Sequence, residues 1–301
     1  MADAVVPKAI RDSAPVYRSR SQRQMAFERF RQHRLAVASG FVVLAIALLS
    51  AFAPIVSPYD PNKTQLLLIF EPPSLGHPMG TDSLGRDLAT RILFGGRVSM
   101  TVGVLAALIA VVAGTVIGAV AGYYGGLADG ILMRLVDVLL SVPRLFILIL
   151  LSVLFGGTVF TIILVLGALS WMRTSRIVRA TVLSLKGREF VEAARAVGAS
   201  DIRIMVRHLL PNTVAPIVVA ATLGVAGAII AESTLSFLGL GIQKPTSTWG
   251  NMLTDATTDM TSAPWVAIFP GLAIFLAVVS INFVGDGLRD ALDPRRVVGK
   301  Q

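Results

Sequence analysis

Four ionisable residues lie in otherwise apolar stretches, where charged side chains most often have a specific task. Arg134, Asp137 and Arg144 interrupt one such stretch, and Glu232 lies near the end of another. Placing a charge in hydrocarbon costs about 2.5–3.5 kcal/mol on insertion scales, so such groups usually face a cavity or a partner. Arg134 and Asp137 are close enough in sequence to predict a mutual ion pair. Arg144 follows Pro143, and we expect it either to line a cavity and bind carboxylate or carbonyl groups, or to pair with an acid such as Glu232.

Arrangements for covalent or metal chemistry are absent from the sequence. There is no cysteine, which excludes disulfides, thiol catalysis and cysteine metal sites. The 3 histidines are scattered, and no Ser/His/Asp, HExxH or paired-acid pattern stands out. No GxxxxGK[ST] phosphate loop occurs, since Gly299-Lys300 is the only Gly-Lys pair. We therefore expect no catalytic residues, no metal site and no cofactor bound by this chain.

The composition predicts an integral membrane protein. Of the 301 residues, 54% are hydrophobic and 15% are charged, and the mean hydropathy is +0.73. A soluble domain has roughly 25% charged residues, so this chain has too few charges to cover a soluble surface. The net charge of +9 is better explained by basic residues on one side of a lipid bilayer than by nucleic-acid binding.

Six apolar segments are long enough to cross a bilayer, which requires about 20 predominantly apolar residues. The first occupies residues 35–56 and ends among prolines; no small-residue cleavage site follows it, so we expect a retained helix rather than a signal peptide. The other five are expected at residues 98–128, 131–155, 158–178, 209–231 and 260–285. The predicted fold class is an all-α integral membrane protein with about six transmembrane helices.

Lys and Arg residues predict the orientation of these spans. There are eight in residues 1–34, eight in residues 173–207 and four in residues 289–301, whereas the connections on the opposite side hold five. The positive-inside rule therefore predicts that both termini are cytoplasmic. The predicted organisation is a basic cytoplasmic tail (1–34), the first span (35–56), an extracytoplasmic loop (57–97), a five-helix core (98–288) containing a cytoplasmic loop (186–211), and a cytoplasmic tail (289–301).

The cytoplasmic connection 186–211 has the pattern of a short amphipathic helix. Apolar residues at i, i+3, i+4 and i+7 form one stripe: Phe190, Ala193, Ala194 and Val197. Glu192 and other charged residues occupy the remaining faces, and Gly198 supplies a helix stop. A helix of this kind, held between two spans, has an apolar face that can dock either on the lipid interface or on a partner protein.

Residues in this connection resemble a known family motif. Glu192-Ala193-Ala194, followed by Gly198 and by Leu210-Pro211, is similar in spacing to the EAA loop of bacterial ABC importer permeases; His208 departs from the isoleucine of that pattern. Two further segments, HPMGTDSLGRDLATRILFGGRVSM (77–100) and ESTLSFLGLGIQKPTSTWGNML (232–253), resemble the dipeptide, oligopeptide and nickel importer branch. Over residues 20–296 the order of motifs resembles the C-type permease subunit of that branch.

The resemblance implies a type I ABC importer permease in a bacterial or archaeal plasma membrane. The implied partners are a second homologous permease, two ATP-binding subunits that hold ATP and Mg²⁺, and an extracytoplasmic substrate-binding protein. Di- or oligopeptides are the implied substrates, with nickel, glutathione or oligosaccharides as alternatives. An ion-driven secondary transporter is the alternative from another class, and would need intramembrane acids or broken helices in inverted repeats.

By the same resemblance, loop 186–211 is the coupling segment that seats on an ATP-binding subunit. Its site residues would be Phe190, Glu192, Ala193, Ala194, Val197, Gly198, Leu210 and Pro211. The candidates for the translocation path are Arg144, Glu232, Asp137 and Asn282. For Glu232, hydrogen bonding to the bent backbone of the following SFLGLG segment is the favoured alternative to a role in an outer gate.

A repeat of small residues predicts close packing within the second span. Gly114, Gly118 and Gly122 recur every four residues and so lie on one helix face. Because glycine has no side chain, another helix can approach that face closely.

Overall fold

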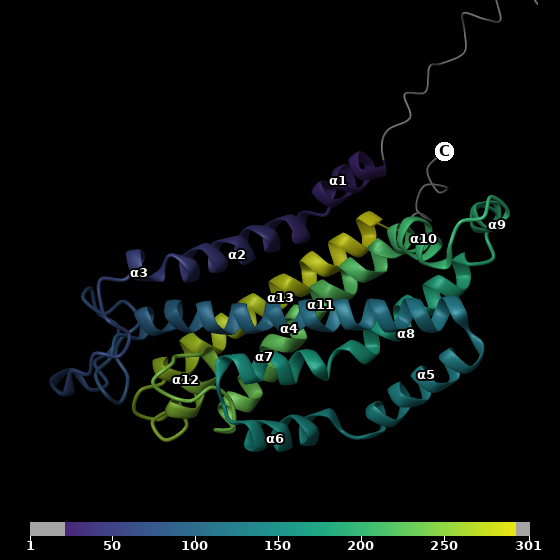
Figure 1. Ribbon diagram of the computed structural model, residues 1–301. Coiled ribbons are helices and arrows are strands. Elements are labelled where there is room, and N and C mark those ends of the chain that lie inside the picture. The colour runs from purple at the N-terminus through teal and green to yellow at the C-terminus, as the bar shows by residue number, and fades with distance from the viewer. Residues whose placement is uncertain (1–21, 293–301) are drawn as a thin grey trace, which may run out of the picture.

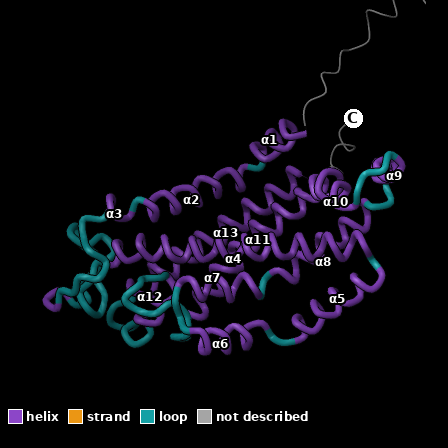
Figure 2. The backbone as a smooth tube through the Cα atoms, viewed as in Figure 1, coloured by secondary structure: helices purple, strands orange, loops and turns teal. Residues whose placement is uncertain are grey.

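Helices joined by turns and loops make up the structure. The computed structural model describes residues 22–292, and within this range no strand is present (Figures 1 and 2). The elements in chain order are α1 (Gln22–Gln32), α2 (Arg34–Ala51), α3 (Ala53–Val56), η2 (Leu66–Leu68), α4 (Leu88–Tyr124), α5 (Gly126–Ser141), α6 (Arg144–Phe155), α7 (Val159–Ala168), α8 (Trp171–Leu185), α9 (Glu189–Ala196), α10 (Asp201–Ile204), the π-helical turn η3 (Met205–Leu209), α11 (Leu210–Phe237), α12 (Trp249–Ala256) and α13 (Trp265–Leu292).

The number of membrane spans agrees with the sequence prediction. In the described part of the chain, five helical segments are long and apolar enough to cross a membrane, and a sixth span is obtained if the bent pair α5–α6 is counted as one. The five are Arg34–Ala51, Leu88–Tyr124, Val159–Leu185, Asp201–Phe237 and Trp265–Leu292.

The predicted third span, residues 131–155, is sharply bent at the Pro143 position that interrupts it. α5 and α6 meet at an angle of 85°. The break lies at Val142, whose φ of −87° and ψ of 131° are extended. The physical cause is Pro143, because the proline ring disfavours the helical conformation of the preceding residue.

Helix α4 is the central element of the bundle. At 37 residues it is about 55 Å long, and it packs against α2, α7, α8 and α11. It runs from the end that holds loop 57–87 and α12 to the end that holds α9 and α10 (Figure 1). The described ends of α1 and α13 also lie at the α9–α10 end, so the segments predicted to be cytoplasmic are together.

The predicted glycine seam is confirmed as packing between α4 and α8. A Cβ atom added at Gly114 would lie 2.7 Å from the carbonyl oxygen of Trp171, and one added at Gly122 would lie 2.9 Å from that of Arg179. At Gly118 between them, the added atom would overlap the carbonyl oxygen of Ser175. The two backbones are therefore in direct contact along about two turns of each helix.

Replacing Gly118 with alanine is expected to destabilise the protein by about 1–3 kcal/mol, the usual cost of overpacking, because backbone atoms of α8 block the new methyl group. Gly227→Ala in α11 is the matched control, since an added Cβ there meets no atom within 4 Å. The thermal unfolding midpoint of the purified protein in detergent measures both. Equal midpoints for the two variants would contradict the close α4–α8 contact.

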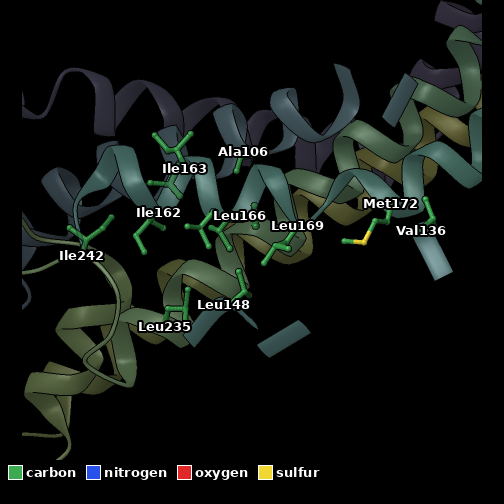
Figure 3. Packing of buried hydrophobic residues seen from close by; sticks show 13 residues of the cluster. Ala106, Val136, Leu148, Ile162, Ile163, Leu166, Leu169, Met172, Leu235 and Ile242 are labelled. Carbon is green, nitrogen blue, oxygen red and sulfur yellow. The ribbon is translucent and has the colours of Figure 1, made fainter. Parts of the chain in front are cut away.

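An apolar cluster holds the bent pair α5–α6 against the bundle (Figure 3). Ile162 and Leu166 of α7 are fully buried in this cluster, where they join Leu148 of α6 and Leu235 of α11. The opposite face of α6 is open: Phe146 and other large apolar side chains of this helix are exposed. This face needs either lipid or another protein to cover it.

Candidate functional site

Helix α9 stands apart from the membrane spans at one end of the bundle (Figure 1). Its Val191 side chain is fully buried in a cluster with Ile204 and Leu209, which anchors the helix to the segment leading into α11. On its other side Phe190 is 40% exposed and Val197, at the end of the helix, is 88% exposed. α9 is thus fastened by one face and presents apolar side chains on another.

The predicted apolar stripe is divided between these two faces. Ala193 is exposed with Phe190 and Val197, but Ala194 is half-buried and packs against the Val191 cluster. Sequence spacing alone did not separate the two alanines, because i+3 and i+4 lie on the same half of a helix. The signal that was missed is Val191, the large apolar side chain of α9 that lies outside the stripe. Glu192 is exposed beside it.

Gly198 ends α9 as predicted. Its φ is +82°, a conformation that side-chain-bearing residues rarely adopt. The Gly198 N–H donates to the Arg195 carbonyl at 2.9 Å and the Ala199 N–H donates to the Ala194 carbonyl at 3.0 Å, which is the Schellman arrangement of a helix end. The chain therefore turns sharply between α9 and α10.

Leu210 and Pro211 begin α11 directly after the π turn η3. A proline inside a regular α-helix removes one hydrogen bond and clashes with the preceding turn. The wider π turn before Pro211 lies where that clash would fall. This allows residues 201–237 to run on as one membrane-length helix.

Asp137 and Arg144 have partners other than those predicted. Asp137 of α5 forms an ion pair with Arg176 of α8, so the predicted pair with Arg134 is wrong. The reason is tertiary: α5 lies beside α8, which also supplies Arg179 to pair with Asp129. Both members of the Asp137 pair are about half exposed, at 53% and 51%.

Arg144 lies at the start of α6 and donates from Nη2 to the Ser170 hydroxyl at 2.8 Å. Its Nε is buried without a hydrogen-bond partner. The alternative in which Arg144 pairs with Glu232 is wrong, because among the described residues Arg144 has no acidic neighbour and Glu232 has only hydroxyl partners. An unmatched buried donor is costly, so Arg144 retains capacity to bind a further acceptor.

Glu232 is fully buried at the end of the bundle that holds α12. Its oxygens accept hydrogen bonds from Ser99 at 3.0 Å and from Ser236 at 2.7 Å. The Ser236 hydroxyl in turn accepts from the Ile242 N–H at 3.2 Å, and Ser99 accepts from the Trp249 N–H at 3.3 Å. Glu232 is thus linked to the bent backbone after α11 through two serine hydroxyls, and not by the direct hydrogen bond to that backbone that the favoured alternative expected. Asn282 is half-buried on α13, away from these contacts.

An ion cluster at the same end was not predicted from the sequence. Asp82, in the loop before α4, pairs with Arg91 and accepts from Arg86 Nε at 2.8 Å. Asp255 of α12 lies 3.7 Å from Arg86 and 3.8 Å from Arg91, and the more exposed Lys244 reaches it at 2.6 Å. The cluster ties loop 57–87 to α12. The sequence feature that could have indicated this cluster is the alternation of Asp and Arg residues in the 77–100 segment.

Burial alone would raise the pKa of Asp82. The charges of Arg91 and Arg86, together with hydrogen bonds from the backbone N–H groups of Leu84 and Arg86, outweigh this effect and hold the pKa below its ordinary value. Asp82 is therefore ionised in the folded protein at neutral pH.

Comparisons with known proteins cover nearly the whole chain. Residues 114–298 match the family described as binding-protein-dependent transport system inner membrane component, and residues 21–73 match the N-terminal TM domain of oligopeptide transport permease C. The chain is 46% identical to the oligopeptide transport system permease protein OppC of Escherichia coli K12 over 92% of each chain. It is 41% identical to OppC of Bacillus subtilis over 90% of this chain and 88% of the relative. It is 43% identical to the glutathione transport system permease protein GsiD of Shigella sonnei over 89% of each.

Proposed function

We propose oligopeptides as the cargo of this chain, which belongs to the binding-protein-dependent transport system inner membrane components and is therefore a permease subunit of an ABC importer. The relatives named for oligopeptide transport match it over about nine-tenths of its length. Glutathione is the second candidate, since a permease named for its transport is similarly close. The chain would form half of a translocation pathway, with a homologous permease as the other half.

The observation that carries this function is the geometry of α9. Val191 fastens the helix to the membrane domain, while Phe190 and Val197 face outward. A helix built in this way can enter a groove on an ATP-binding subunit and transmit its displacement to the spans. ATP and Mg²⁺ would bind to two such subunits, and the pathway would open alternately to each side by rigid-body rearrangement.

The second permease would cover the open face of the α5–α6 pair. Arg144 begins α6 beside this face, and its unmatched Nε is suited to a carboxylate or carbonyl oxygen of a peptide. The proposed path also includes Asp137, Glu232 and Asn282. Of these, Glu232 would act indirectly, through its hydrogen bonds from Ser99 and Ser236. An extracytoplasmic binding protein would deliver peptide to the end formed by loop 57–87 and residues 240–261.

Co-purification tests this function. Tagged chain extracted from its native membrane is expected to bring down a related permease and ATP-binding subunits. The reconstituted complex should hydrolyse ATP faster when loaded binding protein is added and should import labelled oligopeptides in preference to labelled glutathione. Preferential import of glutathione would change the proposed substrate but leave the importer assignment intact. A chain that transports by itself in liposomes on a proton gradient would overturn the importer assignment.

A further inference from the structure

The last turn of α4 contacts the coupling segment at three separate points, all through Tyr123. The Tyr123 hydroxyl donates to Asp201 Oδ1, at the start of α10, at 2.6 Å. The guanidinium carbon of Arg195, in α9, lies 5.6 Å from the centre of the Tyr123 ring. Lys186, at the end of α8, donates to the Tyr123 carbonyl oxygen at 3.3 Å. One residue therefore contacts the coupling segment at Lys186, Arg195 and Asp201.

Apolar packing places Tyr123 in the same cluster as the anchor of α9. The tyrosine side chain is 7% exposed and packs in a cluster with Val191 and Ile204. Apolar contacts of this kind hold the elements together but allow them to slide, since they have little directional preference. The bond to the Asp201 carboxylate is directional and charge-assisted, so it resists sliding. The two kinds of contact together join α9 and α10 to α4.

The other end of α4 is held just as specifically. Arg91 pairs there with Asp82, and the Trp249 indole N–H donates to the Ile92 carbonyl at 3.0 Å. Between the two ends α4 contains no proline, and Figure 1 shows one unbroken helix. Sharp kinks in helices lie at a proline, at Gly/Ser pairs, at a π turn or at an inserted group, and α4 runs as one α-helix from Leu88 to Tyr124 despite its glycines. Tyr123 and the ion cluster therefore lie at the two ends of one continuous helix, about 50 Å apart.

We propose that Tyr123 is the positioning residue through which movement of α9 is transmitted to α4, and that α4 carries it to the opposite end of the bundle. This inference depends on the proposed importer function. α8 moves with α4, since the glycine seam joins their backbones. Without the Tyr123 hydroxyl, α9 and α10 could shift while α4 stayed in place.

The test uses the complete importer, reconstituted with its binding protein, and measures peptide imported per ATP hydrolysed. Tyr123→Phe keeps the ring and its contact with Arg195 but removes the bond to Asp201. We expect the variant to assemble and to hydrolyse ATP, with import per ATP falling by at least about fivefold, the lower end of usual coupling between sites. Tyr124→Phe is the matched control, because it removes the hydroxyl of the exposed neighbouring tyrosine, and it should retain wild-type coupling.

Asp201→Ala removes the same bond from the other side. It should reproduce the Tyr123→Phe phenotype, and the double variant should be no worse than either single one, because all three lack one shared interaction. Additive losses, or a fully coupled Tyr123→Phe complex, would overturn the inference while leaving the importer function intact. A wild-type chain that recovers no ATP-binding subunit would instead overturn the proposed function, and this inference with it.

Discussion

Replacing Phe190 with alanine is expected to reduce the ATP hydrolysis stimulated by binding protein at least about tenfold and to release the ATP-binding subunits during purification. Aromatic anchors at the centre of an interface cost 2 kcal/mol or more when truncated, and 1.4 kcal/mol corresponds to a factor of ten. Phe190 fits that description because it is the only aromatic residue of α9 and is 40% exposed in the isolated chain. Retention of the subunits on an affinity column and the stimulated ATPase rate measure the two effects.

Loss of folding must be separated from loss of docking. The thermal unfolding midpoint of the isolated Phe190→Ala chain should stay close to wild type, because Phe190 lies outside the cluster that anchors α9. Leu127→Ala is the matched control: it truncates a side chain that is 86% exposed on α5, outside the coupling segment. Equal retention of ATP-binding subunits by wild type and Phe190→Ala would contradict the docking role of this face.

Replacing Asp82 with alanine is expected to destabilise the protein by about 3–5 kcal/mol, because removal of one partner leaves buried charges without compensation. Arg86 and Arg91 would remain at the former site, 5% and 1% exposed. The thermal unfolding midpoint and the rate of proteolysis within loop 57–87 measure the change. Asp60→Ala is the control, since the Asp60 carboxylate is exposed and accepts only a local bond from the Asn62 N–H. Similar midpoints for the two variants would refute the role of the cluster.

The same carboxyl predicts the direction of a pH effect. Because its pKa in the folded protein lies below the ordinary value of 3.8, ionisation of Asp82 contributes stability above the pKa of the unfolded chain. That contribution is lost as the pH falls from 3.8 through the lower folded-state pKa. The unfolding midpoint of wild type should therefore drop more steeply in this acid range than that of Asp82→Asn. Parallel curves for the two proteins would contradict the lowered pKa.

Local features of this chain were predictable from its sequence. Apolar stretches of membrane length predict spans in any context, since the bilayer imposes the same minimum length on all of them. Gly198 ends α9 because a positive φ is a property of the residue itself. The four-residue glycine spacing likewise predicted close packing, although it did not identify α8 as the neighbour.

Partners between distant segments could be read only from the tertiary structure. Asp137 pairs with Arg176 rather than with Arg134 because α5 packs beside α8. Glu232 binds serines from two helices, and Arg144 reaches Ser170. Side-chain charge and sequence distance do not specify such pairs, since each acid had several bases available.

The sequence by itself determined a helical membrane protein, its approximate spans and the short motif in segment 186–211 that resembles the family. These depend on hydropathy, helix periodicity and a short motif, all of which are local in the chain. The tertiary structure decided that α9 divides into an anchored and an open face, and that Tyr123 joins this helix to α4. These features depend on which surfaces meet when the helices pack, and residues far apart in the sequence, such as Tyr123 and Asp201, come into contact only then.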